Sequence, residues 1–405
     1  MSDTTQRLGD GQAHPARGRA TGTPVKVVAI IDASSANNAP QDDLCAGNRA
    51  AVRTINETLN GLGGSGRPVE LEIFETNLDP AQTVECARRA AADPECVAVV
   101  GSLVVSYEIS TILAEAGLAS IPAVPCTKDE YYNPLVFNIN GGHISMDGGK
   151  IATAFASGAE HPGSLTTDIP GIPWFVDVHN LTLQRFGLPE ETRLVAAPYV
   201  VDDIAPWVQK SVEGVDAVML TLVNNDDTVN AILARHELGI TTPFIVEGMS
   251  LTPAVLEKLG PAGEGVLVAS LFPAFDADVI GQRRYLDSMR EAGYVQYLGD
   301  KSQMGWITFD LLNHATQGLA SITRESVLAG LRAVTDYTGG GITPPLNFSE
   351  PTGPGAGYPR LYNWTYYPTA IRNGTLVSAV EGGGWAELPT DIPESPVAWA
   401  GFPAS

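Results

Sequence analysis

The glycine-rich run at 61–66 is the pattern in this sequence that comes nearest to a nucleotide-binding motif. Gly61, Gly63 and Gly66 have the spacing G-x-G-x-x-G. In a dinucleotide fingerprint these glycines follow a strand and open a helix, so that the phosphate meets free N–H groups at the helix N-terminus. Here they follow a helical pattern and precede a strand pattern. We therefore interpret the run as a turn and expect no cofactor.

Carboxylate pairs are the other candidates for chemistry, and they occur as adjacent aspartates at 42–43, 202–203 and 226–227. In an acidic chain such pairs are typical of solvated helix starts, where negative charge is favourable. The sequence contains no G-x-S-x-G, no H-E-x-x-H and no P-loop, so hydrolases and nucleotide enzymes lack their usual residues. We therefore expect a protein that is not an enzyme. An enzyme that uses the carboxylate pairs is a further alternative.

The four cysteines, Cys45, Cys86, Cys96 and Cys126, permit disulfides if the protein is extracytoplasmic. Cys86 and Cys96 flank one helix-to-strand connection and are the pair we expect. The alternative is that these residues are small buried thiols without a bond. No C-x-x-C occurs and the six histidines are scattered, which argues against a metal site.

Elements that would position such residues alternate regularly from residue 25 onward. Apolar or alternating runs predict strands, and apolar residues at helical spacing predict helices. The predicted strands are 25–32, 69–73, 97–100, 121–124, a strand near 165, 194–197, 217–222, 244–246 and 266–271. The predicted helices include 52–62, one that begins at the Asp79-Pro80 start signal, 106–117, 151–157, 175–186, 228–238, 279–292 and 306–322. The C-terminal part, rich in Gly, Pro and aromatic residues, is predicted as irregular loops with short strands.

Alternating strands and helices predict parallel sheets built from crossover units. The pattern is interrupted at 137–143 and then resumes, so we expect an α/β fold with two doubly wound parallel-sheet lobes and a ligand cleft between them. We expect a disordered tether at 1–24, a first lobe from 25–140 and 273–346, a second lobe from 141–272 and 347–390, and a tail at 391–405. Hinge motion is expected near 139–143, 272–275 and 345–351.

Charge excludes two classes of partner. The 405 residues contain 24 Lys plus Arg against 46 Asp plus Glu, and the formal net charge is −22. Nucleic acid requires clustered basic residues, and an anionic membrane surface would repel this chain. No apolar run approaches the roughly 20 residues that span a bilayer.

The N-terminal residues 1–23 are polar and lack a hydrophobic signal core. Either the protein is cytoplasmic, or a signal segment that preceded these residues has been removed. We favour the second alternative and expect an extracytoplasmic protein, periplasmic or a cell-surface lipoprotein, on a polar tether.

A series of short motifs carries a family resemblance over roughly 25–348. In chain order they are Val25-Lys-Val-Val-Ala-Ile-Ile31, Ala46-Gly47, Gly66-Arg-Pro-Val-Glu-Leu71, Asp79-Pro80, Ala98-Val-Val-Gly101, Ile121-Pro122 and Glu264-Gly-Val266. In this order and spacing the chain resembles the type I periplasmic binding proteins that serve branched-chain amino acid ABC transporters. The resemblance implies a solute-binding protein that delivers a small amino acid or related carboxylate to a membrane permease. A ligand sensor of the same fold that regulates a partner protein is the alternative.

The resemblance also implies roles for particular residues. The loop after the Val-Val-Gly strand and the loop after the Ile-Pro strand hold the ligand, which assigns Ser106 and Thr127 to its carboxylate. An acidic residue of the second lobe completes the amine site, which assigns Glu247, with Asp129, to the ammonium group. A helix N-terminus at Ser106 suits an anion.

The side-chain pocket departs from the family pattern. The usual Pro-x-Thr-Gly is replaced by Asp32-Ala-Ser-Ser-Ala36, and Asn224 stands where aromatic residues are common. These departures favour a polar or aromatic ligand, with Asn224 and Trp174 on its side chain. The remaining positions that the resemblance places in the cleft are Ser34, Ser102, Cys126 and Met304.

Overall fold

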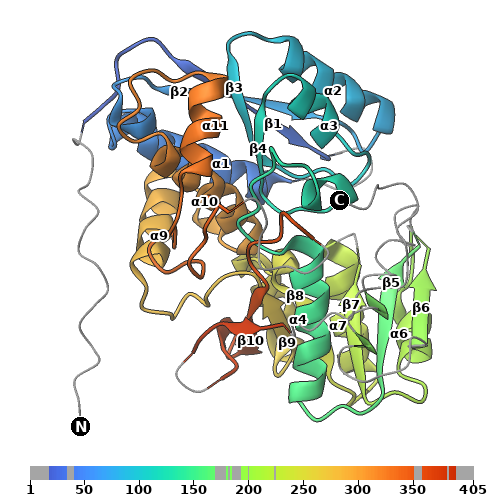
Figure 1. Ribbon diagram of the computed structural model, residues 1–405. Coiled ribbons are helices and arrows are strands. Elements are labelled where there is room, and N and C mark those ends of the chain that lie inside the picture. Colours follow the sequence, from blue (N-terminus) through green and yellow to red (C-terminus); the bar gives the residue numbers. More distant parts are fainter. Residues whose placement is uncertain are drawn as a thin grey trace.

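The computed structural model describes residues 18–33, 41–168, 179–180, 183–184, 193–198, 200–222, 225–350, 358–380 and 383–388. These residues form two lobes, each built round one β-sheet (Figure 1). The expected fold class, α/β with parallel sheets in two lobes, is confirmed. The predicted positions Ser34, Trp174 and Asn224, and most of the helix expected at 175–186, lie outside the described residues.

The first sheet has four parallel strands in the order β2-β1-β3-β4. Its strands are β1 (Val25–Ile31), β2 (Val69–Glu75), β3 (Cys96–Ser102) and β4 (Ala119–Pro122). The helices around it are α1 (Asp42–Glu57), α2 (Pro80–Ala92), α3 (Ser110–Glu115), α9 (Ile280–Ala292), α10 (Asp300–Ala315) and α11 (Arg324–Arg332), with short 3-10 turns η1 (Leu62–Gly64), η2 (Lys128–Tyr131) and η5 (Val295–Tyr297).

Both faces of this sheet are buried, which explains the unbroken apolar run of β1. Val27 and Ala29 face a core shared with α1, α9, α10 and α11. Val28 and Ile30 face a second core, formed with α2 and α3. A strand covered on both faces needs apolar side chains in both directions and therefore loses the polar alternation of an exposed strand.

The glycine run at 61–66 is a turn between α1 and β2, as predicted. Gly61, Gly63 and Gly66 have φ values of 79°, 60° and 77°, which side chains rarely adopt. A Cβ atom on Gly63 would also stand 2.3 Å from the Thr316 carbonyl oxygen. The predicted start of α2 is likewise confirmed, because the Asp79 carboxylate accepts hydrogen bonds from the N–H groups of Ala81 and Gln82.

The second sheet has eight strands. β5 (Pro162–Thr167), β6 (Arg193–Ala197), β7 (Ala217–Thr221), β8 (Phe244–Glu247) and β9 (Leu267–Ser270) are parallel, whereas β10 (Thr365–Arg372), β11 (Thr375–Ser378) and β12 (Ala386–Glu387) join antiparallel. The helices of this lobe are α4 (Gly142–Ala156), α6 (Ala205–Ser211), α7 (Asn225–Glu237) and α8 (Pro253–Leu259), with η3 (Gly248–Ser250) and η4 (Gly260–Gly263). The C-terminal part thus contains an eight-residue strand, β10, longer than the short strands expected there.

Several helix boundaries differ from those predicted. α4 begins at Gly142, well before the expected start at 151, because its glycines are packing positions and do not interrupt the helix. A Cβ atom on Gly149 would lie 2.8 Å from the Tyr366 ring of β10. α10 begins at Asp300, not at 306, and α3 is shorter than the expected 106–117.

The chain passes between the lobes three times: from β4 to α4, from β9 to α9 and from α11 to β10. The first and third passages lie side by side. The Asn363 side-chain amide donates to the Ile139 carbonyl at 3.1 Å, and the Asn138 amide donates to the Arg360 carbonyl at 3.1 Å. Side-chain amides thus tie together backbone segments that are more than two hundred residues apart, 224 and 222 residues respectively.

All four cysteines are free thiols, so the expected Cys86–Cys96 disulfide is wrong. Cys96 is fully buried in β3, and Cys86 lies partly buried on α2 against the same core. Burial raises the pKa of the Cys96 thiol to about 11, which disfavours the reactive thiolate. The alternative of small buried residues is the one that the structure adopts.

Candidate functional site

In the first lobe the candidate anion site is built round Asp32, which follows β1 directly and is 1% exposed. One oxygen of its carboxylate accepts hydrogen bonds from the backbone N–H groups of Val105 and Ser106, each at 2.7 Å. The other oxygen accepts from the Ser106 hydroxyl at 3.0 Å and from the hydroxyls of Thr83 and Thr76. The donors that the sequence assigns to a ligand carboxylate are therefore bound to a carboxylate of the chain.

Ser102 and the loop after β4 are also internally bonded. The Ile30 N–H donates to the buried Ser102 hydroxyl oxygen at 2.9 Å. The Thr127 hydroxyl lies 2.8 Å from Asp129 Oδ1 and 2.9 Å from Glu130 Oε2. Thr127 is the first residue of a capping box that starts η2.

Asp129 and Glu130 are buried carboxyls that hold this loop. Asp129 Oδ2 accepts the Ser110 N–H at 2.7 Å and so supports the start of α3. Glu130 Oε2 accepts the N–H groups of Cys126 and Thr127, at 2.7 and 2.8 Å. Burial, with the adjacent Asp129 charge, raises the pKa of Glu130 to about 8. Burial also raises the pKa of Asp129, although hydrogen bonds from Thr127 and Ser110 oppose the shift.

In the second lobe Glu247 ends β8 and is 9% exposed. A buried carboxylate requires a cationic partner, and the structure supplies one from within the chain. The Lys150 ammonium, on α4, lies 3.3 Å from Glu247 Oε2. It also donates to the Leu220 carbonyl at 3.1 Å and to the Thr221 hydroxyl, at the end of β7.

A second buried network adjoins this pair. His179 Nδ1 lies 2.9 Å from Asp147 Oδ2, and its Nε2 lies 3.4 Å from the Ser164 hydroxyl. Burial alone would raise the pKa of Asp147, but the His179 and Lys150 charges hold it below its ordinary value. The order Asp, His, Ser is that of a hydrolase triad, but all three side chains are largely buried and Ser164 stands within β5. The arrangement therefore ties α4 to the sheet.

Asp300 joins the two lobes at the β9–α9 passage. Its Oδ2 accepts the Leu271 N–H at 3.0 Å, and a Cβ atom on Gly248 would lie 2.2 Å from the same oxygen. Burial raises the pKa of Asp300 to about 7, so this carboxyl titrates near neutral pH. The Asp300 carboxyl thus lies beside Gly248, the residue that follows Glu247.

The structure thus brings Ser102, Ser106, Cys126, Thr127 and Asp129 together beyond the ends of β3 and β4, and it places Glu247 at the end of β8 in the other lobe. Met304 does not join either group. It is fully buried on α10 in the core of the first lobe.

Sequence reasoning missed Asp32, Glu130, Lys150 and Asp300 as members of these networks. A signal for Lys150 was available: it is the one cation in the largely apolar helix 142–156. Asp32 was noted only as a departure from the family pattern, and its position directly after a buried strand was the useful observation.

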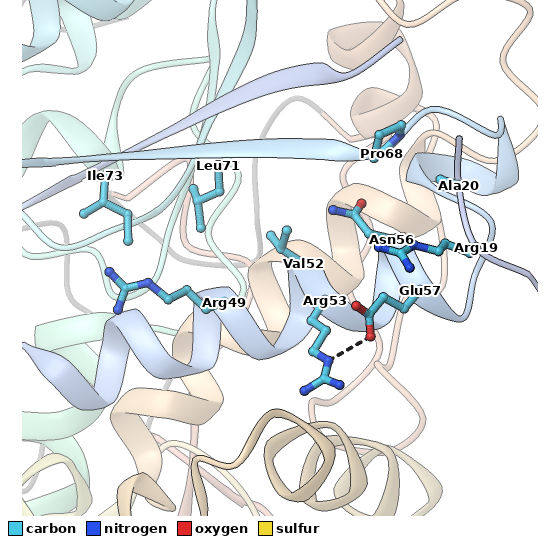
Figure 2. Close-up of a pocket in the computed structure, with 10 residues that line it drawn as sticks. All are labelled: Arg19, Ala20, Arg49, Val52, Arg53, Asn56, Glu57, Pro68, Leu71 and Ile73. Carbon is cyan, nitrogen blue, oxygen red and sulfur yellow. Dashed lines mark hydrogen bonds and ion pairs between the residues drawn. The ribbon is translucent and has the colours of Figure 1, made fainter. Parts of the chain in front are cut away.

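A cavity lies away from these networks, on the first lobe between α1 and β2 (Figure 2). It is lined by residues of those two elements and by Arg19, Ala20 and Pro68. Among the described residues no group of three His, Cys, Asp or Glu side chains is suited to a metal ion. No helix in the described part of the chain has the length and apolarity to cross a membrane.

Solved structures share this fold at low sequence identity. A possible leucine/isoleucine/valine-binding protein from Rhodopirellula baltica SH 1 is 17% identical, with a TM-score of 0.71 over 89% of this chain and 98% of that one. A fatty acid ABC transporter substrate-binding protein from Thermomonospora curvata is 14% identical, with a TM-score of 0.73 over 94% and 97%. A solute-binding protein of an ABC transporter from R. palustris, in complex with benzoate, is 15% identical, with a TM-score of 0.72 over 92% and 100%.

No curated protein sequence matches this chain. The sequence profile of the periplasmic binding proteins, in contrast, matches residues 24–366, which is most of its length. The resemblance inferred from the motifs at 25–348 is therefore confirmed, and the chain belongs to the periplasmic binding protein family.

Proposed function

We propose that this protein is the extracytoplasmic solute-binding component of an ABC importer and closes its two lobes on a small carboxylate. The observation that carries the proposal is the placement of polar side chains at the carboxyl ends of parallel strands in both lobes: the buried Asp32 and Ser102 in the first, and the half-buried Thr221 and buried Glu247 in the second. Ligands of open α/β sheets bind beyond the carboxyl ends of the strands. The family match, and the ABC transporter substrate-binding proteins among its structural neighbours, support a membrane permease as partner.

The ion pair between Lys150 and Glu247 narrows the ligand class. A free buried carboxylate at Glu247 would favour a ligand ammonium group, but the Lys150 ammonium 3.3 Å away already neutralises it. A second cation at this point would be repelled by Lys150. We therefore propose a carboxylic acid without an α-ammonium group in preference to an amino acid. Benzoate and a fatty acid are named with two structural neighbours.

Closure would occur by rotation at the three passages between the lobes, near 139–143, 272–275 and 345–351. The side-chain amides of Asn138 and Asn363, which tie the first passage to the third, support a joint hinge in which these two segments move together.

Matched pairs of ligands test the ligand class by thermal shift. Isocaproate differs from leucine only by the missing α-ammonium group, and hydrocinnamate differs in the same way from phenylalanine. A ligand that binds only the folded protein stabilises it by about 2.7 kcal/mol at a hundredfold excess over its Kd. We expect benzoate, isocaproate or hydrocinnamate to raise the melting temperature by a few degrees, and the two amino acids to leave it unchanged.

The variant Glu247→Gln sharpens this test. It removes one of the two carboxylates that pair with Lys150 and leaves only Asp147, 3.8 Å away, so binding of a simple carboxylate should be retained or become tighter. Glu213→Gln, at an exposed ion pair with Arg193, serves as control. If leucine raises the melting temperature more than isocaproate and Glu247→Gln abolishes that effect, the ligand is an amino acid and Glu247 binds its amine. If no carboxylate shifts the melting temperature, the proposed class is wrong.

A further inference from the structure

The cavity between α1 and β2 is a groove of about 700 Å³ with an apolar floor and a basic rim. The residues that decide its chemistry are Val52, Leu71 and Ile73 on the floor and Arg19, Arg49 and Arg53 on the rim. Figure 2 shows Arg49 and Ile73 at one end of the groove, and Arg19, Ala20 and Pro68 at the other. The floor residues are only partly buried.

The charge of this groove is opposite to that of the whole chain. The chain has a net charge of −22, but the groove is lined by three arginines and a single carboxylate, Glu57. Glu57 lies 2.9 Å from Arg53 Nε, and the Arg53 guanidinium also donates to the Glu291 carbonyl. Arg19 and Arg49 are exposed and make no ion pair with another described residue. The guanidinium groups of Arg19 and Arg49 are therefore available for an anionic partner, and so is Nη2 of Arg53, which bonds no other described residue.

The groove also runs along a free sheet edge, because β2 is the last strand of its sheet. Val25 pairs with Val69 in register, and its N–H donates to the Pro68 carbonyl at 2.8 Å. In a parallel ladder this register turns the backbone groups of 70, 72 and 74 toward β1 and those of 69, 71 and 73 outward.

Side-chain amides cover both ends of this edge but not its middle. The Asn56 side chain pairs with the outward N–H and carbonyl of Val69, at 2.7 and 2.9 Å. The Gln82 amide donates to the Glu75 carbonyl at 3.1 Å. Between them, no described residue bonds the outward backbone groups of Leu71 and Ile73. A short free edge of this kind is a template for an added strand.

We propose that this groove binds an extended acidic segment of a partner polypeptide, which adds to β2 at Leu71 and Ile73. Arg49 and Arg53 are four residues apart on α1, so their side chains stand about 5–6 Å apart along one face. Alternate side chains of an extended strand repeat at about 6.6 Å. Acidic side chains at alternate positions of the added strand all face the α1 side and can therefore each meet one arginine, while the intervening side chains face the opposite side of the sheet.

Two other occupants fit the observations less well. A lipid bilayer offers anionic headgroups but no backbone groups for the edge of β2, and it would be repelled by the net charge of −22. A second copy of the chain carries the same net charge and would be repelled for the same reason. The site is separate from the ligand region, so its test does not depend on the proposed function.

A labelled six-residue peptide of alternating Glu and Val, with blocked ends, is a direct probe by fluorescence anisotropy at low salt. We expect Arg49→Ala to weaken its binding about tenfold, the effect of about 1.4 kcal/mol, and the matching Lys–Val peptide not to bind. Arg290→Ala is the control, because Arg290 is exposed on α9, pairs with Asp287 and does not line the groove. Equal binding by the wild type and Arg49→Ala overturns the proposal.

Backbone pairing is tested on the peptide, so that the protein remains intact. Two forms of the probe carry N-methyl groups on alternate amides, in the two possible registers. Only one edge of an added strand bonds β2, so one form should lose at least tenfold in affinity and the other should bind as before. If neither methylated form is weakened, strand addition is wrong.

Two further measurements separate the other occupants. Flotation with phosphatidylglycerol vesicles and sedimentation equilibrium are compared for the wild type and Arg49→Ala. Binding to vesicles, or self-association, that is lost in Arg49→Ala while the peptide does not bind would overturn the proposal in favour of a membrane or a second copy. The melting-temperature shift by a carboxylate should be the same in Arg49→Ala, which separates failure here from failure of the proposed function.

Discussion

The Asp32 carboxylate accepts the backbone N–H of Ser106 at 2.7 Å and its hydroxyl at 3.0 Å, although the two residues are 74 positions apart in the chain. Asp32 follows β1, and Ser106 stands in the loop after β3, the neighbouring strand. The carboxyl ends of parallel strands meet at one edge of a sheet, which brings these residues together. An internal carboxylate thus holds in place a loop that could otherwise bind an external one.

Replacing Asp32 should therefore destabilise the first lobe strongly. In Asp32→Ala the N–H groups of Val105 and Ser106 and the hydroxyls of Thr76 and Thr83 lose an acceptor in a partly buried site, and each donor left unsatisfied costs up to about 1–3 kcal/mol. We expect a loss of roughly 3–5 kcal/mol in the free energy of unfolding, measured by urea denaturation. Asp79→Ala, which removes the N-cap of α2, should cost only about 1 kcal/mol. Equal losses for the two variants would contradict this account.

The Lys150–Glu247 pair should show strong coupling in a double-mutant cycle. Lys150→Met leaves a buried carboxylate without its cation, and breaking a buried pair in this way costs about 3–5 kcal/mol. Adding Glu247→Gln removes the unpaired charge, so the double variant should regain most of that loss. The exposed pair Arg193–Glu213 serves as the comparison and should couple by about 1 kcal/mol or less. Simple additivity of the Lys150 and Glu247 losses in urea would show that the two charges do not interact.

Glycines on α1 and α10 allow these helices to approach closely. This contact can be tested by a substitution that adds one methyl group. A Cβ atom on Gly47 would stand 1.9 Å from the backbone carbonyl oxygen of Ser302, which cannot rotate away. We expect Gly47→Ala to lower the free energy of unfolding by more than about 3 kcal/mol, the upper end of overpacking costs.

Gly117→Ala is the control for this steric effect. Gly117 has a φ of 70°, but a Cβ atom there meets nothing within 4 Å. Its replacement should cost only the left-handed backbone strain of about 1–2 kcal/mol. If the two alanine variants unfold at the same urea concentration, a Cβ atom on Gly47 does not clash with Ser302 and the close contact between α1 and α10 is wrong.

Local patterns in the sequence predicted the elements better than they predicted the contacts between them. The strand at 25–32, the turn at 61–66 and the helix start at Asp79 each depend on neighbouring residues, and the structure contains all three. The helix containing Gly148 and Gly149 was predicted too short, because these glycines make room for Leu388 and Tyr366, which are more than two hundred residues away in the chain.

The candidate site was harder to predict for the same reason. Glu247 was assigned to a ligand amine through the family resemblance, because the residues around it in the sequence fit an exposed turn equally well. Its partner Lys150 is 97 residues away and on another element, so only the fold identifies it. The capping of η2 by Thr127 and of α3 by Asp129 likewise gives these side chains structural partners that a family motif does not reveal.

Stability should depend on pH through Asp300. Burial raises the pKa of this carboxyl from 3.8 to about 7, so the folded protein retains a proton that the unfolded chain releases above pH 4. Between these values the folded state binds more protons, and stability therefore falls as pH rises from about 4 to 7 and is level above that.

Asp300→Asn still offers an oxygen to the Leu271 N–H but cannot ionise. We expect the free energy of unfolding of the variant to rise relative to that of the wild type across this range, by a difference on the order of 4 kcal/mol at pH 8. Urea denaturation at a series of pH values gives the difference curve, and Asp287→Asn, at an exposed ion pair, should change little. A difference between Asp300→Asn and wild type that stays constant from pH 5 to 8 would show that Asp300 is already ionised in the folded protein throughout this range.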